Sequence, residues 1–178
     1  MTEFFIFWSN CVAVAIVGFS LLPGLAQAQS ESRSQNPVQK AVAIMAHASG
    51  TFEVKLTPQK ADNKEAEGAN IGRMSIDKHF HGDLEGTSQG EMLSSMSEVQ
   101  GSGAYVAIER VSGTLHGRSG TFVFLHGGTM TRGEPKLNVS VVPDSGAGQL
   151  VGLSGTMMIK ITEGKHFYEF DYRLPDTK

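Results

Sequence analysis

The sequence predicts an all-β protein, built as an eight-stranded antiparallel up-and-down barrel. Glycine is frequent, with 21 in 178 residues, against about 7% in an average protein, and it separates short runs of Val, Ile, Phe and Thr. No segment after the first 40 residues shows the sustained 3.6-residue period of a helix. Because the runs follow one another with short connections, closure into a barrel would leave no unprotected edge strand. A β-sandwich is the alternative architecture.

The strands are expected where β-branched and aromatic residues cluster between turn signals. A recurrent Ser-Gly-Thr sequence, as at Ser112 and Ser119, is interpreted as a glycine bend after which threonine resumes the strand. The expected ranges are 47–56, 72–81, 84–95, 103–115, 120–131, 137–142, 149–161 and 166–174.

Residues 1–28 are expected to be a secretory signal peptide. An apolar stretch from Cys11 to Leu22 is followed by a Pro-Gly break and by Ala26-Gln27-Ala28, a good cleavage site. Cleavage after Ala28 would export the protein to the periplasm or the medium, remove its only cysteine, and leave no membrane segment. A retained anchor is the alternative, although the uninterrupted apolar run is shorter than the ~20 residues that span a bilayer.

The rest of the chain is expected to hold one domain. Residues 29–45 begin with a polar, aperiodic stretch and are expected to form a flexible leader, and residues 46–178 a single β-barrel domain. The chain has 15 Lys and Arg against 18 Asp and Glu, a formal net charge of −3. No basic tract stands out, which excludes nucleic acid as a partner.

Residues 105–130, YVAIERVSGTLHGRSGTFVFLHGGTM, predict a hairpin that turns at Gly117-Arg118. Glycine at the first central position suits a type II′ turn. In that register Glu109 lies directly opposite His126 on an otherwise apolar inner face, and the small side chains of Ala107 and Gly128 leave room beside the pair.

A carboxylate and an imidazole on opposed strand positions are within hydrogen-bonding reach. Burial and mutual attraction would let such a pair hold a proton near neutral pH, as general acid–base catalysis requires. Glu109 and His126 are therefore the candidate catalytic residues. A buried polar pair that only fixes the strand register is the alternative.

Aromatic and Met side chains on the same inner face are candidates for binding a ligand. The last hairpin is expected to turn at Glu163-Gly164, which pairs Ile159 with Tyr168 and Met157 with Phe170 on an apolar face. The candidate ligand-binding residues are Tyr105, Phe122, Phe124, Met130, Tyr168 and Phe170.

The outer face of the central hairpin is unusually apolar. Val106, Ile108, Val123 and Leu125 would point away from the lumen. Such a surface indicates a homo-oligomer interface, or a surface that residues 38–46 cover.

The segment DKHFHGDLE places Asp77, His79, His81, Asp83 and Glu85 on one strand face. Histidine and carboxylates suit divalent metals, but no second metal motif follows, and a solvated strand face is the expected interpretation. Neither a nucleophile elbow nor a phosphate-binding loop is present. No metal and no cofactor are therefore expected.

Several segments carry a likeness to a known family: GDLEGTSQGEML (82–93), YVAIERVSGTLHGRSGTFVF (105–124), GTMTRGEP (128–135), VVPDSG (141–146), GLSGTM (152–157) and GKHFYEFDYRLP (164–175). From about Ala48 to Pro175 the chain resembles an uncharacterised bacterial domain-of-unknown-function family, whose structures are allene oxide cyclase-like (calycin-like) β-barrels. The resemblance implies a fold and no activity, since fold does not carry function.

The leading functional hypothesis is an exported barrel that binds a small, largely apolar molecule in its lumen. One alternative is a cofactor-free isomerase or cyclase, in which Glu109, His126 or Tyr168 moves a proton. The other is a structural homo-oligomer. The sequence names no ligand and leaves open whether the protein is an enzyme.

Overall fold

The structure is a computed structural model that describes residues 45–60, 63 and 70–175. The predicted signal peptide at 1–28 and residues 29–44 of the predicted leader lie outside the described residues. The strands are β1 (Met45–Gln59), β2 (Ile71–Gly82), β3 (Leu84–Met96), β4 (Gly103–Leu115), β5 (Arg118–Thr131), β6 (Glu134–Val141), β7 (Ala147–Gly148), β8 (Ser154–Thr162) and β9 (Lys165–Arg173).

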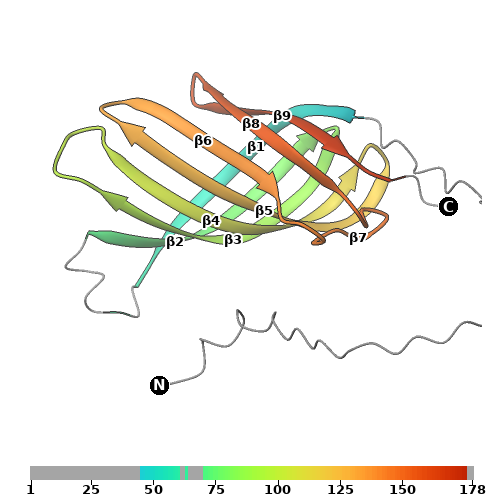
Figure 1. Cartoon of the computed structure of the whole chain (residues 1–178), viewed down its shortest axis with the longest axis horizontal. Coiled ribbons are helices and arrows are strands. Elements are labelled where there is room, and N and C mark those ends of the chain that lie inside the picture. Colours follow the sequence, from blue (N-terminus) through green and yellow to red (C-terminus); the bar gives the residue numbers. More distant parts are fainter. Residues whose placement is uncertain (1–44, 61–62, 64–69, 176–178) are drawn as a thin grey trace, which may run out of the picture. The chain divides into compact units, whose positions relative to one another are not determined.

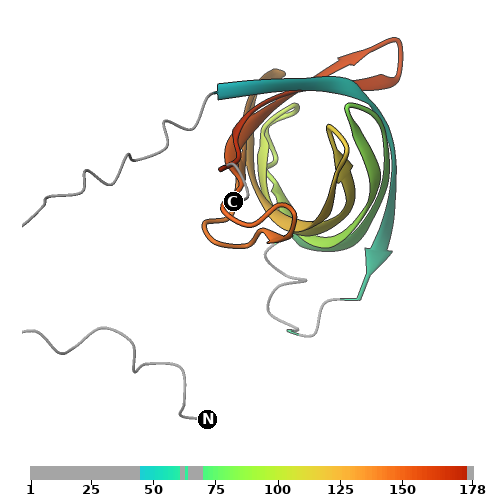
Figure 2. The ribbon, with the colours of Figure 1, turned by 90° about the vertical axis from the view of Figure 1, so that its right-hand side faces the viewer.

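Eight long strands close into an antiparallel barrel (Figures 1 and 2). Each strand pairs with its neighbours in order, β4 also pairs with β5, and β1 pairs with β9, so the sheet closes on itself. The ladder between β6 and β8 is the shortest between the long strands, with two register pairs. The two-residue β7 attaches to the side of β5. The predicted all-β, eight-stranded antiparallel barrel is thus confirmed. Its narrower assignment to the allene oxide cyclase-like group stays a prediction.

Side chains of a loop fill one end of the barrel, which we call the closed end. The predicted strand at 149–161 begins only at Ser154, because residues 149–153 belong to the loop between β6 and β8. This loop lies at the end of the barrel that faces the viewer in Figure 2. It carries Leu150 and Leu153 into the hydrophobic core, where they join Leu84 and Leu115 in complete or nearly complete burial. The loop therefore acts as a plug.

Aromatic rings fill the interior next to that plug. Phe122, Phe124 and Phe170 contact one another, and Phe170 also stacks on Tyr172. Their positions alternate with outward-facing residues along each strand, as the two-residue period of a barrel requires. Burial of these rings, together with that of the leucines, stabilises this end of the barrel.

The central hairpin turns one residue earlier than predicted. Leu115 pairs with Arg118, so that His116 and Gly117 form the turn with φ values of 46° and 80°. Two positive φ values define a type I′ turn rather than the expected type II′ turn. Glu109 consequently lies opposite Phe124, and His126 opposite Ala107. The predicted direct pairing of Glu109 with His126 is wrong by two residues.

A two-residue shift leaves every side chain on its predicted face, because the side-chain period of a strand is two. The last hairpin has the predicted register throughout, with Thr162 paired with Lys165 and Ile159 with Tyr168. Among the residues that the structure describes, none belongs to a helix long and apolar enough to cross a membrane.

Candidate functional site

Four polar side chains lie together inside the barrel. Lys78 on β2, Ser88 on β3, Glu109 on β4 and His126 on β5 come from consecutive strands and face the lumen, and each is at most 6% exposed. We call these four residues the polar cluster. They are the buried polar or charged residues of the described chain. The polar side chains in the interior of the barrel therefore lie together in one place.

Glu109 is the centre of the cluster. Its Oε1 accepts a hydrogen bond from Lys78 Nζ at 2.8 Å, and the same oxygen lies 2.9 Å from His126 Nε2. Its Oε2 accepts a hydrogen bond from the Ser88 hydroxyl at 2.9 Å. The contact of Glu109 with His126 is therefore present although the register differs, because diagonal neighbours on adjacent strands are still within reach of long side chains.

The environment of Glu109 favours the ionised carboxylate. Burial raises the pKa of its carboxyl, but the His126 hydrogen bond and the charge of Lys78 outweigh burial and lower the pKa to about 2. The carboxylate therefore stays charged at neutral pH, and that the pair holds a proton there stays a prediction. Within the cluster the imidazole of His126 remains the candidate proton acceptor.

Rings and one glycine hold the cluster in place. Lys78 Nζ lies 4.9 Å from the centroid of the Phe52 ring and 5.8 Å from that of Phe80, in cation–π contact. The Phe124 ring meets the His126 ring edge to face. Gly90 is paired with Glu109, and a Cβ atom at Gly90 would lie 2.6 Å from the Cβ of Glu109. Only glycine fits there.

Away from the plug, the barrel wall carries apolar side chains that solvent reaches. We call this part of the lumen the open end. Leu56, Leu137 and Met130 face inward there, and they are 47%, 39% and 36% exposed. Tyr105 is half-buried, and its ring occupies the space beside Gly128, where a Cβ atom would lie 2.3 Å from Cε1 of the ring. The room predicted beside Gly128 is therefore filled by Tyr105.

The six candidate ligand-binding residues all face the lumen but divide into two groups. Tyr105 and Met130 belong to the open end. Phe122, Phe124, Phe170 and Tyr168 are at most 1% exposed and pack against other core side chains. Their contact with a ligand stays a prediction.

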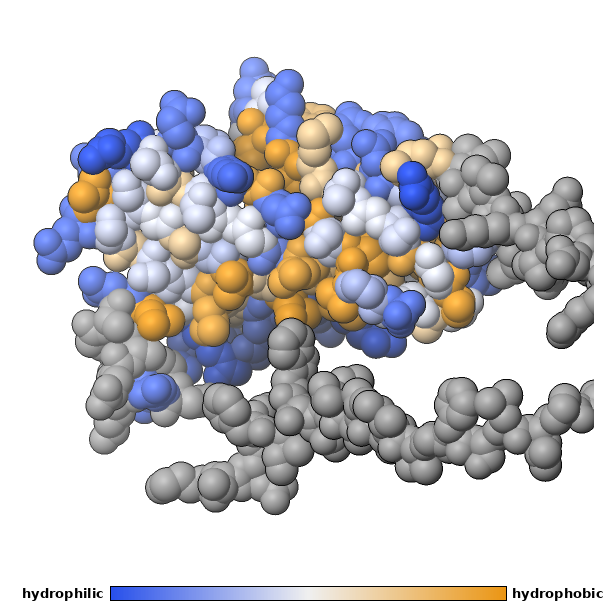
Figure 3. All heavy atoms as spheres, in the orientation of Figure 1, coloured by the Kyte–Doolittle hydropathy of each residue, from blue (hydrophilic) through white to orange (hydrophobic). Residues whose placement is uncertain are grey.

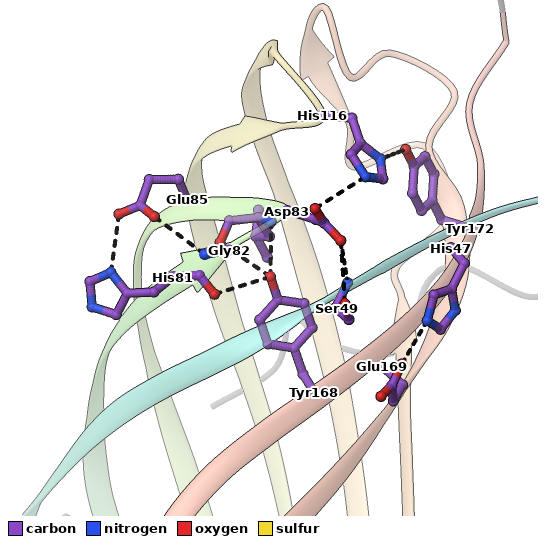
Figure 4. A network of polar contacts seen from close by, with 11 residues as sticks. His47, Ser49, His81, Gly82, Asp83, Glu85, His116, Tyr168, Glu169 and Tyr172 are labelled. Atoms are coloured by element: carbon purple, nitrogen blue, oxygen red, sulfur yellow. Dashed lines mark hydrogen bonds and ion pairs between the residues drawn. The ribbon is translucent and has the colours of Figure 1, made fainter.

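The Tyr168 hydroxyl contacts backbone atoms beside the turn between β2 and β3 (Figure 4), and no hydrogen bond among the described residues joins it to the polar cluster. It accepts a hydrogen bond from the Leu84 amide at 2.9 Å and lies 3.4 Å from the carbonyl oxygen of His81. The structure thus brings Glu109 and His126 together, while the Tyr168 hydroxyl anchors the turn between β2 and β3.

The acidic and histidine side chains of the segment 77–85 lie on the strand face opposite to that of Lys78 and Phe80. His81 lies between Glu53 and Glu85, at 3.1 Å and 3.2 Å, on the outer surface. Asp83 accepts a hydrogen bond from the Ser49 amide at 2.8 Å and lies 3.5 Å from His116 Nε2 (Figure 4). In the described part of the chain no group of three His, Cys, Asp or Glu side chains is arranged to hold a metal ion.

The outer face of β4 and β5 is exposed. Val106, Ile108 and Leu125 are 56%, 56% and 42% exposed, and with Val123 we call them the outer patch. They line a groove of about 640 Å³ whose polar residues include Glu91 and Arg110. Figure 3 shows an apolar band along the lower part of the molecule in that view, where β3, β4 and β5 lie.

Two members of the polar cluster, Lys78 and Ser88, were not predicted. A usable signal was present for Lys78, because Met74, Ile76 and Phe80 occupy the alternate positions on its strand. A lysine on an apolar strand face needs a buried partner. Nothing in the local sequence distinguishes Ser88 from other serines on exposed strand faces.

These features define a class of protein, a closed antiparallel β-barrel with an ion pair enclosed in its lumen. The chain belongs to the DUF3224 family, described as a protein of unknown function, whose family model matches residues 48–172. A protein of unknown function from the DUF3224 family of Shewanella oneidensis MR-1, known from a crystal structure, is similar. It shares 53% identity over 75% of this chain and 100% of that chain, with a TM-score of 0.70. No curated protein matches the chain.

Proposed function

We propose that the protein binds a small, largely apolar molecule in the open end of its barrel, with the polar cluster orienting the polar end of that molecule. Ligand sites commonly combine an apolar wall with a few convergent polar groups. The inner-facing Leu56, Met130 and Leu137 supply such a wall, and the cluster supplies the polar groups. On the prediction that residues 1–28 are a signal peptide, the proposed site of this activity is the periplasm or the medium.

The observation that carries the proposal is the buried ion pair of Lys78 with Glu109. Desolvating two charges costs several kcal/mol, and well-packed apolar residues of similar size often give equal or greater stability. Aromatic packing already fills the closed end, and apolar side chains of similar size could continue that packing at the position of the pair. A role in ligand recognition accounts for charged groups in the lumen.

A matched pair of leucines tests the proposal. Leu56 faces the lumen and Leu93 faces outward, and they are similarly exposed, at 47% and 50%. Binding of N-phenyl-1-naphthylamine, a neutral apolar fluorophore, is titrated with the wild type, Leu56→Gln and Leu93→Gln. We expect Leu56→Gln to weaken binding about fivefold or more and Leu93→Gln to leave it unchanged. Equal effects, or no binding by the wild type, would contradict lumen binding.

A second candidate function is proton transfer on a bound molecule, as in a cofactor-free isomerase or cyclase. The contact of His126 with an ionised Glu109 favours it, because this arrangement orients an imidazole base. Incubating apolar ketones with the protein in D₂O and following α-hydrogen exchange by mass spectrometry tests this function. Exchange that is lost in His126→Gln would support it, and exchange at the uncatalysed rate would exclude it for those ketones.

We propose in addition that a second copy of the chain covers the outer patch. Contiguous exposed apolar surface marks interaction sites. The groove also carries both signs of charge, with Glu91 paired to Arg73 and with Arg110 on a neighbouring strand, so that an identical face related by a twofold axis can oppose Arg110 to the carboxylate of Glu91. Such self-complementarity is what an isologous dimer needs.

A further inference from the structure

The hydrogen bond to Glu109 fixes where His126 carries its proton. A carboxylate accepts hydrogen bonds and donates none, and Glu109 already accepts from Lys78 and Ser88. The low pKa of Glu109 keeps it in that form. The His126 Nε2 atom, 2.9 Å from Oε1, must therefore carry a hydrogen and donate it. In the neutral imidazole the other nitrogen, Nδ1, is then an acceptor with a free lone pair.

His126 faces the lumen and is 3% exposed. The described residues provide its Nδ1 with no hydrogen-bond partner, since the polar contact of this ring is the one with Glu109. Among those residues, every fully buried side-chain nitrogen or oxygen has a hydrogen-bond partner. Because Nδ1 has none, it is not fully buried, and solvent must reach it. The neighbouring Phe124 and the loop leucines at the closed end are fully or almost fully buried. Access to Nδ1 is therefore from the open end.

We infer that His126 Nδ1 selects ligands whose polar end donates a hydrogen bond, such as an alcohol, a phenol or an enol, attached to an apolar body. This inference rests on the proposed function and names the class of ligand that the same site takes. A carboxylate ligand would face the lone pair of Nδ1 and the charge of Glu109, while the compensating charge of Lys78 is already paired. An ether or a ketone would bring a second acceptor against an acceptor.

The first test reads the tautomer directly and needs no ligand. Long-range ¹H–¹⁵N correlation spectra of the purified, ¹⁵N-labelled protein at pH 8 distinguish protonated from unprotonated ring nitrogens, and a His126→Gln variant assigns the signals. We expect His126 as the Nε2–H tautomer. Glu109→Gln, whose amide donates as well as accepts, should raise the population of Nδ1–H. The control Glu91→Gln, the same change on an outer-face carboxylate, should leave the tautomer unaltered.

The second test compares three probes of one shape: 2-naphthol, its methyl ether 2-methoxynaphthalene, and 2-naphthoate. We expect the wild type and Glu91→Gln to bind 2-naphthol about tenfold more tightly than the ether, the ratio that one hydrogen bond gives, and to bind 2-naphthoate most weakly. In Glu109→Gln the preference for naphthol over the ether should fall several-fold. Far-UV circular dichroism checks that this variant remains folded.

The outcomes separate this inference from the proposed function. If the ether or the naphthoate binds as tightly as naphthol, the lumen binds ligands but His126 does not select donors, and the inference is wrong alone. If none of the three probes binds, the proposed function fails and the inference fails with it. If the NMR spectra show His126 as Nδ1–H in the wild type, the inference is overturned whatever the probes do.

Discussion

Lys78 and Glu109 form their 2.8 Å ion pair across an intervening strand. Lys78 lies on β2 and Glu109 on β4, with β3 between them. Ser88 on β3 occupies the gap and donates its hydroxyl hydrogen to the second carboxylate oxygen. The pair therefore links three strands through side chains alone, in addition to their backbone ladders.

The first prediction concerns acid stability. Glu109 has a folded-state pKa of about 2, below the ordinary carboxyl value of 4.5. A depressed folded pKa gives stability that is present above pH 4.5 and is lost as the pH falls through about 2. The difference corresponds to about 3 kcal/mol at most. We expect urea unfolding of Glu109→Gln to lose less free energy than the wild type between pH 4.5 and pH 2. Equal losses in both proteins would show that Glu109 is not the group responsible.

The second prediction compares two tyrosine hydroxyls. The hydroxyl of Tyr168 accepts a hydrogen bond from the buried Leu84 amide, whereas that of Tyr105 has no partner among the described residues. Tyr168→Phe leaves the amide unsatisfied, and we expect it to lower the free energy of unfolding by about 1–3 kcal/mol. Tyr105→Phe should change it by less than about 0.5 kcal/mol. Chemical denaturation measures both, and a loss of similar size in the two variants would contradict the anchoring role of Tyr168.

The third prediction concerns adjacent glycines on β5. A Cβ atom at Gly128 would lie 2.3 Å from the Tyr105 ring, while one at Gly127 would meet nothing within 4 Å. Gly128→Ala must displace the ring, and we expect a cost of about 1–3 kcal/mol together with altered NMR signals from Tyr105. Gly127→Ala should be neutral or should stabilise by up to about 1 kcal/mol. If Gly128→Ala is tolerated with the Tyr105 signals unmoved, the ring does not occupy that space.

The fourth prediction concerns the outer patch. If a second copy covers it, Leu125→Lys or Ile108→Lys should give a monomer in light scattering and retain the far-UV spectrum of a folded sheet, because both side chains lie on the outside. Met158→Lys, at an exposed apolar position on β8, is the control and should leave the assembly intact. A wild type that is monomeric at all concentrations would refute the proposed interface.

The fifth prediction concerns export. Cleavage after Ala28 should give a mature protein that begins at Gln29, because Ala26-Gln27-Ala28 has small residues at the required positions. N-terminal sequencing of protein from the periplasmic fraction checks this. Intact Met1 in the membrane fraction would instead support a retained anchor.

The two hairpins show how far turn prediction from sequence reaches. Glu163-Gly164 forms the predicted turn, with glycine at the position that a positive φ favours. Glycine is also the second turn residue of the central hairpin, where glycine was predicted first, so the rule that succeeds for Glu163-Gly164 covers both turns. His116 adopts a φ of 46°, as Glu163 adopts 52°, and non-local contacts accompany it. Its Nδ1 lies 2.6 Å from the Tyr172 hydroxyl on β9, and its amide donates to the Asp83 carbonyl. No pattern within the hairpin itself contains those partners.

The candidate site was predictable only in part, because some of its contacts join strands that are distant in the sequence. Alternation along the strands places Glu109 and His126 on the inner face in either register, so their proximity follows from the sequence. Lys78 is contributed by β2, which is not adjacent to β4, and the ion pair depends on the curvature of the closed sheet. That curvature brings together side chains from strands that do not pair. A prediction made from the sequence of one hairpin at a time does not include the curvature of the closed sheet.

The seam between β1 and β9 makes the barrel suitable for circular permutation. Met45, the first residue of β1, is the register partner of Arg173, the last residue of β9. A short flexible linker would therefore join the two positions, and new termini could be opened in the turn between Met96 and Gly103 without removing any strand pair. The permuted chain would form that seam as a local hairpin, but its two ends would then be joined by the thirteen register pairs of β3 with β4, against eight pairs of β1 with β9 in the original order. Because the longer ladder becomes the long-range one, we expect the permuted chain to reach the same barrel and to fold no faster than the original.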